Sequence, residues 1–143
     1  MPGMFQVGIS AVIEDAEGRI LLMRRASSKD FGALEWEPVS GRMEAGESPL
    51  DAVQREVLEE TGLSVTSIAP FDTFHFDRNG IELVGIAFAC HLVDGDLRLS
   101  PEHDQAMWVS REQMTRVSVS SRVGASLDRY WNWRGAVARV PLE

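Results

Sequence analysis

Residues 41–63 read GRMEAGESPLDAVQREVLEETGL, and this stretch carries the strongest local structure signal in the chain. Ser48 is a residue type that caps helices, Pro49 fits the first helical position, and Gly62 is typical of a helix end. We therefore predict a helix of about thirteen residues between Ser48 and Gly62.

Three glutamates share one side of this helix. Glu56, Glu59 and Glu60 are spaced i, i+3 and i+4, so at about 100° per residue they occupy an arc of roughly 100°. Such spacing brings like charges together, which destabilises a helix. The arc is interpreted either as a solvated acidic face or as a site where carboxylate oxygens bind a divalent cation. It lies beside the apolar stripe expected to pack on a sheet, which is Leu50, Val53 and Val57.

Length and composition predict one folded domain over residues 1–143. Hydrophobic residues make up 44% and charged residues 25% of the chain. The net charge of −8 disfavours nucleic acid as a partner, because binding to phosphates requires clustered Lys and Arg. An acidic protein can still act on an anionic substrate when bound cations supply positive charge locally.

The longest apolar segments are too short for a membrane helix. They cover residues 8–13 and 84–90, far below the roughly 18 residues that span a bilayer. The first residues lack a secretory pattern, so we expect a cytoplasmic protein without a membrane partner. A homodimer is left open. Cys90 lies in an apolar segment and is expected to be a small core residue rather than a reactive thiol.

Alternating and apolar segments elsewhere predict a largely β-structured remainder. Asn79-Gly80 is a strong hairpin turn signal. The expected strands are residues 7–15, 19–24, 36–39, 63–76, 81–93 and 106–109, the expected loops are residues 26–33 and 41–46, and a last helix is expected over residues 118–137.

The predicted helix belongs to a longer pattern. Five residues separate Gly41 from Glu47, seven more lead to the run Arg55-Glu56-Val57-Leu58-Glu59-Glu60, and residues 61–63 close it. This pattern resembles the Nudix box of the MutT-like Nudix hydrolases at every specified position. The resemblance implies an α/β fold with a mixed β-sheet sandwiched between α-helices. It also implies a hydrolase that uses Mg²⁺, or Mn²⁺ as a substitute, to cleave a diphosphate bond in a nucleoside diphosphate linked to another group.

The same resemblance implies roles for five residues of the box. Glu59 and Glu60 look like direct magnesium ligands, and Glu56 looks like a ligand or the base that activates water. Arg55 and Glu47 look like a pair that orients the carboxylates, which adds Arg55 to the catalytic set. A helix-end salt bridge is the structural alternative for this pair.

Two further positions are carried by the resemblance. Many family members have paired glycines before the box, whereas this chain has Ser40-Gly41, which leaves the Ser40 backbone carbonyl available as a metal ligand. The family often supplies one more acid ahead of a tryptophan-containing strand. Glu102 is the candidate ligand or base, with His103 and Asp104 as alternatives beside it and a solvated loop as the structural alternative.

Arginines and aromatic residues allow both functional and structural interpretations. Arg24, Arg25 and Arg42 could pair with substrate phosphate or simply lie in solvent. Histidines 75 and 91 fall in expected strands and are assigned hydrogen-bonded structural roles. Four aromatic residues could stack a base, but core or interface positions are favoured for all of them, namely Phe74, Phe76, Trp131 and Trp133.

Two other functions are compatible with the resemblance. A nucleotide-sensing module would not need to keep Glu56, Glu59 and Glu60 together, which favours an enzyme. An isoprenoid diphosphate isomerase would need a protonating cysteine, and Cys90 lies in no motif for that role. The substrate stays open among nucleoside triphosphates, nucleotide sugars and similar compounds.

Overall fold

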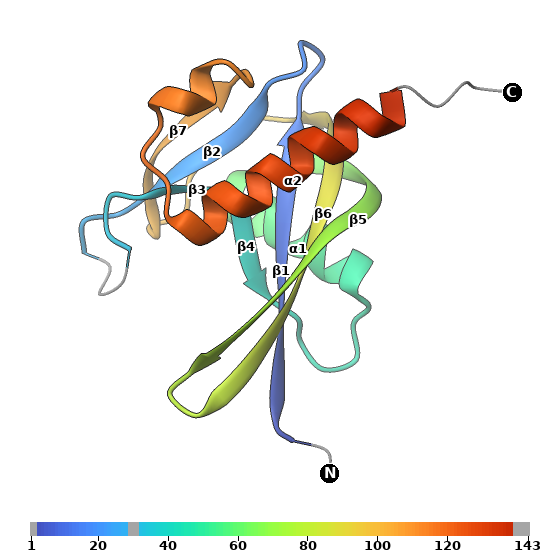
Figure 1. Cartoon of the computed structure of the whole chain (residues 1–143), viewed down its shortest axis with the longest axis vertical. Helices are drawn as coiled ribbons and strands as arrows, with labels where there is room; N and C mark the ends of the chain where they lie inside the picture. Colours follow the sequence, from blue (N-terminus) through green and yellow to red (C-terminus); the bar gives the residue numbers. More distant parts are fainter. Residues whose placement is uncertain (1–2, 29–31, 139–143) are drawn as a thin grey trace, which may run out of the picture.

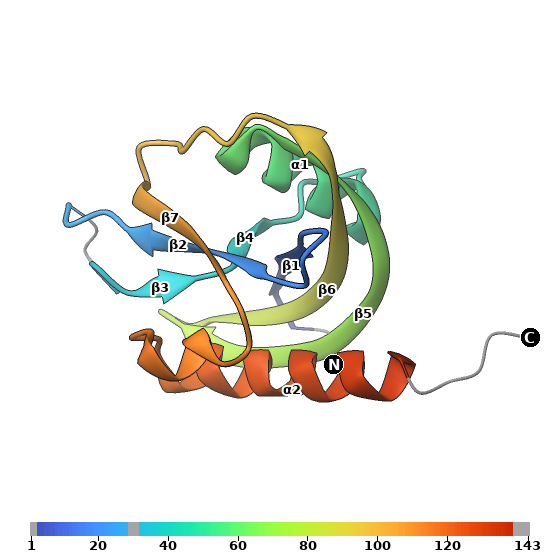
Figure 2. The ribbon, with the colours of Figure 1, turned by 90° about the horizontal axis from the view of Figure 1, so that it is seen from above.

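The computed structural model describes residues 3–28 and 32–138, in which one β-sheet lies between two helices (Figures 1 and 2). Figure 2 shows α1 on one face of the sheet and α2 on the other. The helices are α1 (Pro49–Thr61) and α2 (Ser121–Ala138). The strands are β1 (Phe5–Glu14), β2 (Ile20–Arg25), β3 (Trp36–Glu37), β4 (Val39–Arg42), β5 (Leu63–Arg78), β6 (Ile81–Gly95) and β7 (His103–Val109).

β1 lies at the centre of a mixed sheet. It pairs in parallel with β6, from Phe5 opposite Glu82 to Glu14 opposite His91, whereas β2 and β4 pair with it antiparallel. The strand order is β3-β2-β1-β6-β5, with β4 on β1 and β7 on β2. The expected mixed sheet between helices is therefore confirmed.

Each helix covers its own apolar cluster. Leu21 and Met23 of β2 join the cluster under α1, whereas Ile20 and Leu22 join the cluster under α2. The division follows from strand geometry, because successive side chains point to opposite faces of a sheet. Both faces of the sheet centre are thus apolar, and polar side chains are left to its edges and ends.

The predicted helix forms with the predicted ends. The Ser48 hydroxyl accepts a hydrogen bond from the Asp51 N–H at 3.1 Å, and Gly62 ends the helix in the left-handed region at φ 74°. Val53 and Val57 are fully buried. Leu50 is 51% exposed, so its place in the buried stripe was wrong. Leu50 lies on the same side of the helix as Val53 and Val57, but it is in the first turn, where the sheet does not cover it.

Several predicted boundaries need correction. Gly41 lies inside β4, so the loop before α1 begins after Arg42. β7 begins at His103 rather than Ala106, because it pairs with β2 as far as Arg25. Residues 113–116 form a short 3-10 helix, η1 (Gln113–Arg116), that the sequence analysis missed. Part of the predicted loop 26–33, residues 29–31, lies outside the described residues.

Cys90 occupies the predicted core position, where burial raises the pKa of its thiol to about 11.

The two histidines of β5 and β6 do not have the expected structural roles. His75 and His91 are both exposed, and the nearest acid to His75 is Glu82 at 4.0 Å. No helix in residues 3–28 or 32–138 is long and apolar enough to cross a membrane.

A buried carboxylate anchors α2 to β1. Glu14 is 8% exposed, and it accepts hydrogen bonds from the Tyr130 hydroxyl at 2.8 Å and from Arg134 Nε at 2.6 Å. Burial disfavours the charged form, but the two hydrogen bonds outweigh it and hold the pKa of Glu14 below its ordinary value. The orientation of α2 over the sheet therefore depends on a pair of polar contacts within an apolar cluster.

We expect Tyr130→Phe to lower the free energy of unfolding by about 1.5–3 kcal/mol, because it removes a hydrogen bond to a buried charged group. Urea denaturation should show a lower midpoint with an unchanged slope. Thr73→Val, which removes a hydroxyl from an exposed position of β5, should stay within about 0.5 kcal/mol of wild type. Equal stability of Tyr130→Phe and wild type would contradict this anchoring role.

Candidate active site

The three glutamates of α1 lie in three different environments. Glu60 is buried at 9% exposure, Glu56 is half-buried, and Glu59 is exposed. The helical arc alone placed all of them at the rim of the core. Glu60 instead lies within the packed face of α1, which makes its charge the most unfavourable of the three.

Glu60 is surrounded by other carboxylates. Burial raises its pKa to about 8, and the charges of Glu56, Glu102, Glu37 and Glu59 act in the same direction. Its Oε2 atom is buried and has no hydrogen-bond partner among the described residues. A buried oxygen without a donor is destabilising, so this position suits a proton or a cation.

Arg55 connects the acids of α1 with the loop before it. Its Nε and Nη2 atoms donate to the two oxygens of Glu47 at 2.9 and 2.6 Å, and this fork lowers the pKa of Glu47 to about 2. Its Nη1 atom donates to Glu56 at 3.0 Å and to Glu59 at 3.3 Å. The predicted contact between Arg55 and Glu47 is therefore present, and the same guanidinium fixes the Glu56 carboxylate.

Glycine at position 41 lets the Glu56 carboxylate lie directly against β4. A Cβ atom on Gly41 would lie 2.1 Å from Cδ of Glu56. The Arg42 backbone N–H donates to the Glu56 carboxylate. Burial nevertheless raises the pKa of Glu56, against the opposing effect of Arg55. Glu56 is thus held between a strand edge and a guanidinium.

The Ser40 carbonyl is directed away from β1. The Met43 N–H donates to the Val7 carbonyl at 2.9 Å, and backbone groups of an antiparallel strand face the partner at every second residue. Residues 40 and 42 therefore present their carbonyls on the other edge of β4. The Arg42 carbonyl fits this alternation, because it accepts a hydrogen bond from α1 at 2.9 Å. The Ser40 carbonyl lies on the same edge.

The two candidate acids at the start of β7 lie in different places. The Glu102 carboxylate is near enough to Glu60 to raise its pKa. Asp104 instead forms a two-bond ion pair with Arg24, with N–O distances of 2.8 and 2.9 Å. Of these two candidates, the fold brings Glu102 to the carboxylate cluster and places Asp104 in a salt bridge between β2 and β7.

Glu37 is an acid of this site that the sequence analysis missed. Its Oε1 atom lies 3.1 Å from Arg25 Nη1 and 3.0 Å from His103 Nε2, and its charge acts on Glu60. His103 is buried, and its other ring nitrogen has no partner among the described residues. His103 therefore holds Glu37 in place and does not face the pocket itself.

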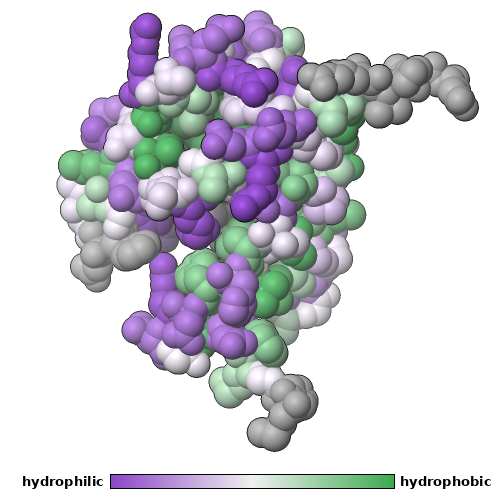
Figure 3. All heavy atoms as spheres, in the orientation of Figure 1, coloured by the Kyte–Doolittle hydropathy of each residue, from purple (hydrophilic) through white to green (hydrophobic). Residues whose placement is uncertain are grey.

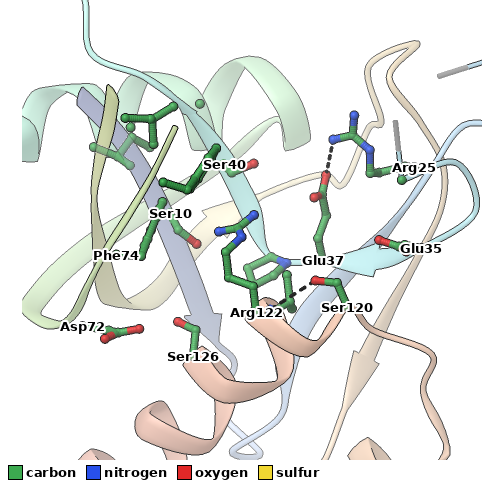
Figure 4. Close-up of a pocket in the computed structure, with 18 of the residues that line it drawn as sticks. Ser10, Arg25, Glu35, Glu37, Ser40, Asp72, Phe74, Ser120, Arg122 and Ser126 are labelled. Atoms are coloured by element: carbon green, nitrogen blue, oxygen red, sulfur yellow. Dashed lines mark hydrogen bonds and ion pairs between the residues drawn. The ribbon is translucent and has the colours of Figure 1, made fainter. Parts of the chain in front are cut away.

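A pocket of about 410 Å³ opens beside these acids, a size that suits a small molecule. Its lining includes Glu37 of β3, Ser40 of β4, Asp72 of β5 and Arg122 of α2 (Figure 4). Figure 3 shows a hollow on this face between the main body and the β5–β6 hairpin, bordered by hydrophilic side chains. The pocket thus extends from the carboxylate cluster to residues that are distant in sequence.

The three arginines proposed for phosphate do not lie together. Arg25 and Arg42 line the pocket. Arg24 is not among the lining residues, because its guanidinium is engaged by both oxygens of Asp104. The expected phosphate contact of Arg24 is therefore not supported by its position.

Two of the four aromatic residues lie elsewhere than expected. Phe74 and Phe76 line the pocket, and the Arg122 guanidinium lies 5.1 and 5.0 Å from their ring centroids. They share one face of β5 because they are two residues apart. Trp131 of α2 is buried in the apolar cluster between this helix and the sheet, and Trp133 packs against the same cluster, as expected of core residues.

The oxygen atoms of this site are of the kind that binds a divalent cation, but the carboxylates do not all point to one position. Carboxylates and a backbone carbonyl are the oxygen ligands that Mg²⁺ takes, and the unpartnered Glu60 oxygen lies among them. Within the described residues, no three Asp, Glu, His or Cys side chains form a ready metal-binding group. Arg55 is one reason for this, because it donates hydrogen bonds to Glu56 and Glu59 and so holds their carboxylates beside its own guanidinium.

Comparison with known proteins gives the same result from sequence and from structure. A sequence profile described as NUDIX domain matches residues 4–127. An uncharacterized Nudix hydrolase of Yersinia pestis is 34% identical over 107 residues, which cover 73% of this chain and 58% of the relative. The solution structure of the E. coli ORF135 protein is similar at a TM-score of 0.77 and 27% identity, covering 93% of both chains. The MutT protein from Methanosarcina mazei Go1 has a TM-score of 0.77 at 24% identity, covering 94% of this chain and 98% of its own.

The raised pKa of Glu60 predicts a pH-dependent stability of the metal-free protein. The ordinary value is 4.5 and the folded value is about 8, so between these pH values the folded state holds a proton that the unfolded state has lost. The contribution of Glu60 to stability should therefore be largest below about pH 4.5 and fall as the pH rises toward 8, by up to about 1.4 kcal/mol per pH unit.

Glu60→Gln should remove most of this slope, whereas the same change at the neighbouring exposed residue, Glu59→Gln, should keep it. Thermal melting of the three proteins in chelator at pH 5, 6, 7 and 8 measures the difference. Parallel curves for wild type and Glu60→Gln would show that the Glu60 carboxylate finds a partner in the folded state.

Proposed function

The chain belongs to the NUDIX domain family, and on that premise we propose that it is a magnesium-dependent hydrolase of a diphosphate bond in a nucleoside diphosphate derivative. The observation that carries the proposal is the buried Oε2 atom of Glu60, which lies within a cluster of carboxylates and has no hydrogen-bond donor in residues 3–28 and 32–138. A packed domain tolerates such a group where a ligand completes it. The adjoining pocket provides the place for a substrate.

The proposed ligands come from two elements that the fold brings together. Glu56, Glu59 and Glu60 of α1 and the backbone carbonyl of Ser40 on β4 would hold the cation. A bound divalent cation would offset the charge of phosphate oxygens and acidify the attacking water. Arg55 and Glu47 act as positioning residues, because their ion pair fixes the carboxylate of Glu56.

Glu102 is our choice for the group that takes the proton from the attacking water. The carboxylate of Glu56 is already engaged by hydrogen bonds from Arg55 and from the Arg42 N–H, and Glu56 is also one of the proposed metal ligands. Glu102 lies before β7, opposite α1, and still acts on the same cluster. Oxygen from water forms a bond to phosphorus, the bridging P–O bond breaks, and the proton goes to the carboxylate.

Two arginines of the pocket would bind the phosphates. Arg42 is exposed beside the acids, and Arg25 lines the same pocket next to Glu37. Guanidinium groups bind phosphate through paired hydrogen bonds. Their presence explains how a chain of net charge −8 would hold an anionic substrate.

The alternative functions receive less support from the residues. A sensor has no need for an unpartnered buried carboxylate such as Glu60. An isomerase that protonates through cysteine is disfavoured, because burial raises the pKa of Cys90 and the thiol does not line the pocket. A single domain and a cytoplasmic location stay as predictions from the sequence. The sequence leaves undecided whether the protein forms a homodimer.

Hydrolysis should require a divalent cation. We expect phosphate release from a panel of nucleoside triphosphates and nucleotide sugars in millimolar Mg²⁺, with coupled pyrophosphatase or phosphatase, and its loss after exhaustive chelation. Readdition of Mg²⁺ or Mn²⁺ should restore it. Turnover that persists in chelator would overturn the proposed mechanism.

Substitution of individual acids should distinguish the residues of the active site from acids that have no role in catalysis. We expect Glu56→Gln, Glu60→Gln and Glu102→Gln each to lower kcat by about a hundredfold or more, because each removes a metal ligand or proton acceptor. Glu17→Gln, in the turn between β1 and β2, is the matched control and should retain normal turnover. Near-normal kcat for two of the three site variants would require a different assignment.

A further inference from the structure

One wall of the pocket is an aromatic surface that the proposed hydrolysis does not use. The rings of Phe74 and Phe76 lie nearly parallel, at 12°, with centroids 6.2 Å apart. A Cβ atom on Gly85 would lie 2.0 Å from the Phe74 ring, so the glycine lets this ring lie over β6. Both rings line the pocket, and the Arg122 guanidinium lies over them, 5.1 and 5.0 Å from the two centroids, so a base that enters here would contact the rings together with this guanidinium.

An acid lies beside this surface. Asp72 precedes Phe74 by two residues on β5, lines the same pocket, and has a side chain that is only 7% exposed. Its Oδ2 atom is bound by Arg129 at 3.2 Å. Figure 4 shows Asp72 near Ser126 and Ser10, with Arg122 reaching in from α2. The ion-paired carboxylate can only accept hydrogen bonds.

We propose that Phe74, Phe76 and Asp72 form a subsite for a nucleobase that carries an amino group. Aromatic rings and guanidinium planes stack bases of every type. The acceptor-only carboxylate of Asp72 then selects a base edge that donates, as cytosine and guanine do through their amino groups. Uracil presents a carbonyl oxygen in place of the cytosine amino group, and a carboxylate repels it.

This inference rests on the proposed function, because it orients the substrate relative to the acids. With its base on β5, a nucleotide would extend its phosphates across the pocket toward Ser40 and Arg42 on β4. The phosphates would then reach the edge of β4 that faces Glu56. The chemistry and the choice of base are thus assigned to opposite ends of one pocket.

The test measures binding without turnover. Titration calorimetry of the whole protein in chelator, with cytidine, uridine, guanosine and inosine 5′-monophosphates and ribose 5-phosphate, makes the result independent of hydrolysis. Within each pair, cytidine with uridine and guanosine with inosine, only the first member carries the amino group. We expect wild type to bind the cytidine compound about tenfold more tightly than the uridine compound, and the guanosine compound more tightly than the inosine compound.

Two sets of variants identify the residues. Phe74→Leu and Phe76→Leu should each weaken all four nucleotides by about tenfold and leave ribose 5-phosphate unchanged, because only stacking is lost. Asp72→Asn should abolish the preference for amino-bearing bases. Arg129→Gln leaves the carboxylate in place and should retain that preference, which keeps the test usable if Asp72→Asn fails to fold.

Equal affinities within both nucleotide pairs for wild type, or no effect of either phenylalanine variant, would overturn the subsite. Hydrolysis in the panel assay could still be observed in that case, so failure of the subsite and failure of the proposed function are distinguishable. Base selectivity without any hydrolysis would retain the subsite and reject the enzyme.

Discussion

The candidate site depends on the close approach of β4 to α1 at Gly41. A Cβ at this position would lie 2.1 Å from the Glu56 carboxyl carbon, so any other residue type would displace the Glu56 carboxylate from the strand. The same approach lets the Arg42 N–H donate to Glu56 and the Arg42 carbonyl accept from Arg55. A single glycine thereby aligns a strand edge with a row of carboxylates.

This alignment concentrates negative charge, and the charges are compensated unequally. Glu47 and Glu56 are satisfied by Arg55, and Glu37 by Arg25 and His103. Within the described part of the chain, Oε2 of Glu60 receives no hydrogen bond, and Glu60 is the most deeply buried acid of α1. In the metal-free fold the Glu60 carboxylate is therefore destabilising, whereas the neighbouring acids have partners. Functional sites commonly reduce local stability in this way.

The sequence predicted the parts of the fold that depend on local spacing. The cap at Ser48, the stop at Gly62 and the glutamates of α1 lie within one turn or a few turns of each other. Glu37 and Asp72 were missed because their partners His103 and Arg129 are distant in the chain, and only strand pairing and helix packing bring them together. The exposure of Leu50 was missed because periodicity gives an angle on a helix and not the extent of the surface that covers it.

One local signal could have located the second half of the pocket. Asp72, Phe74 and Phe76 alternate along a strand, so an acid and two aromatic rings had to share one face. The alternation could not show that this face opens to a pocket, because Arg122 and Gly85, which shape it, come from other elements. The acids therefore follow from a contiguous motif, whereas the pocket wall follows from tertiary packing. Changes on β5 and at the start of α2 could thus alter the accepted base while the box and its carboxylates stay the same.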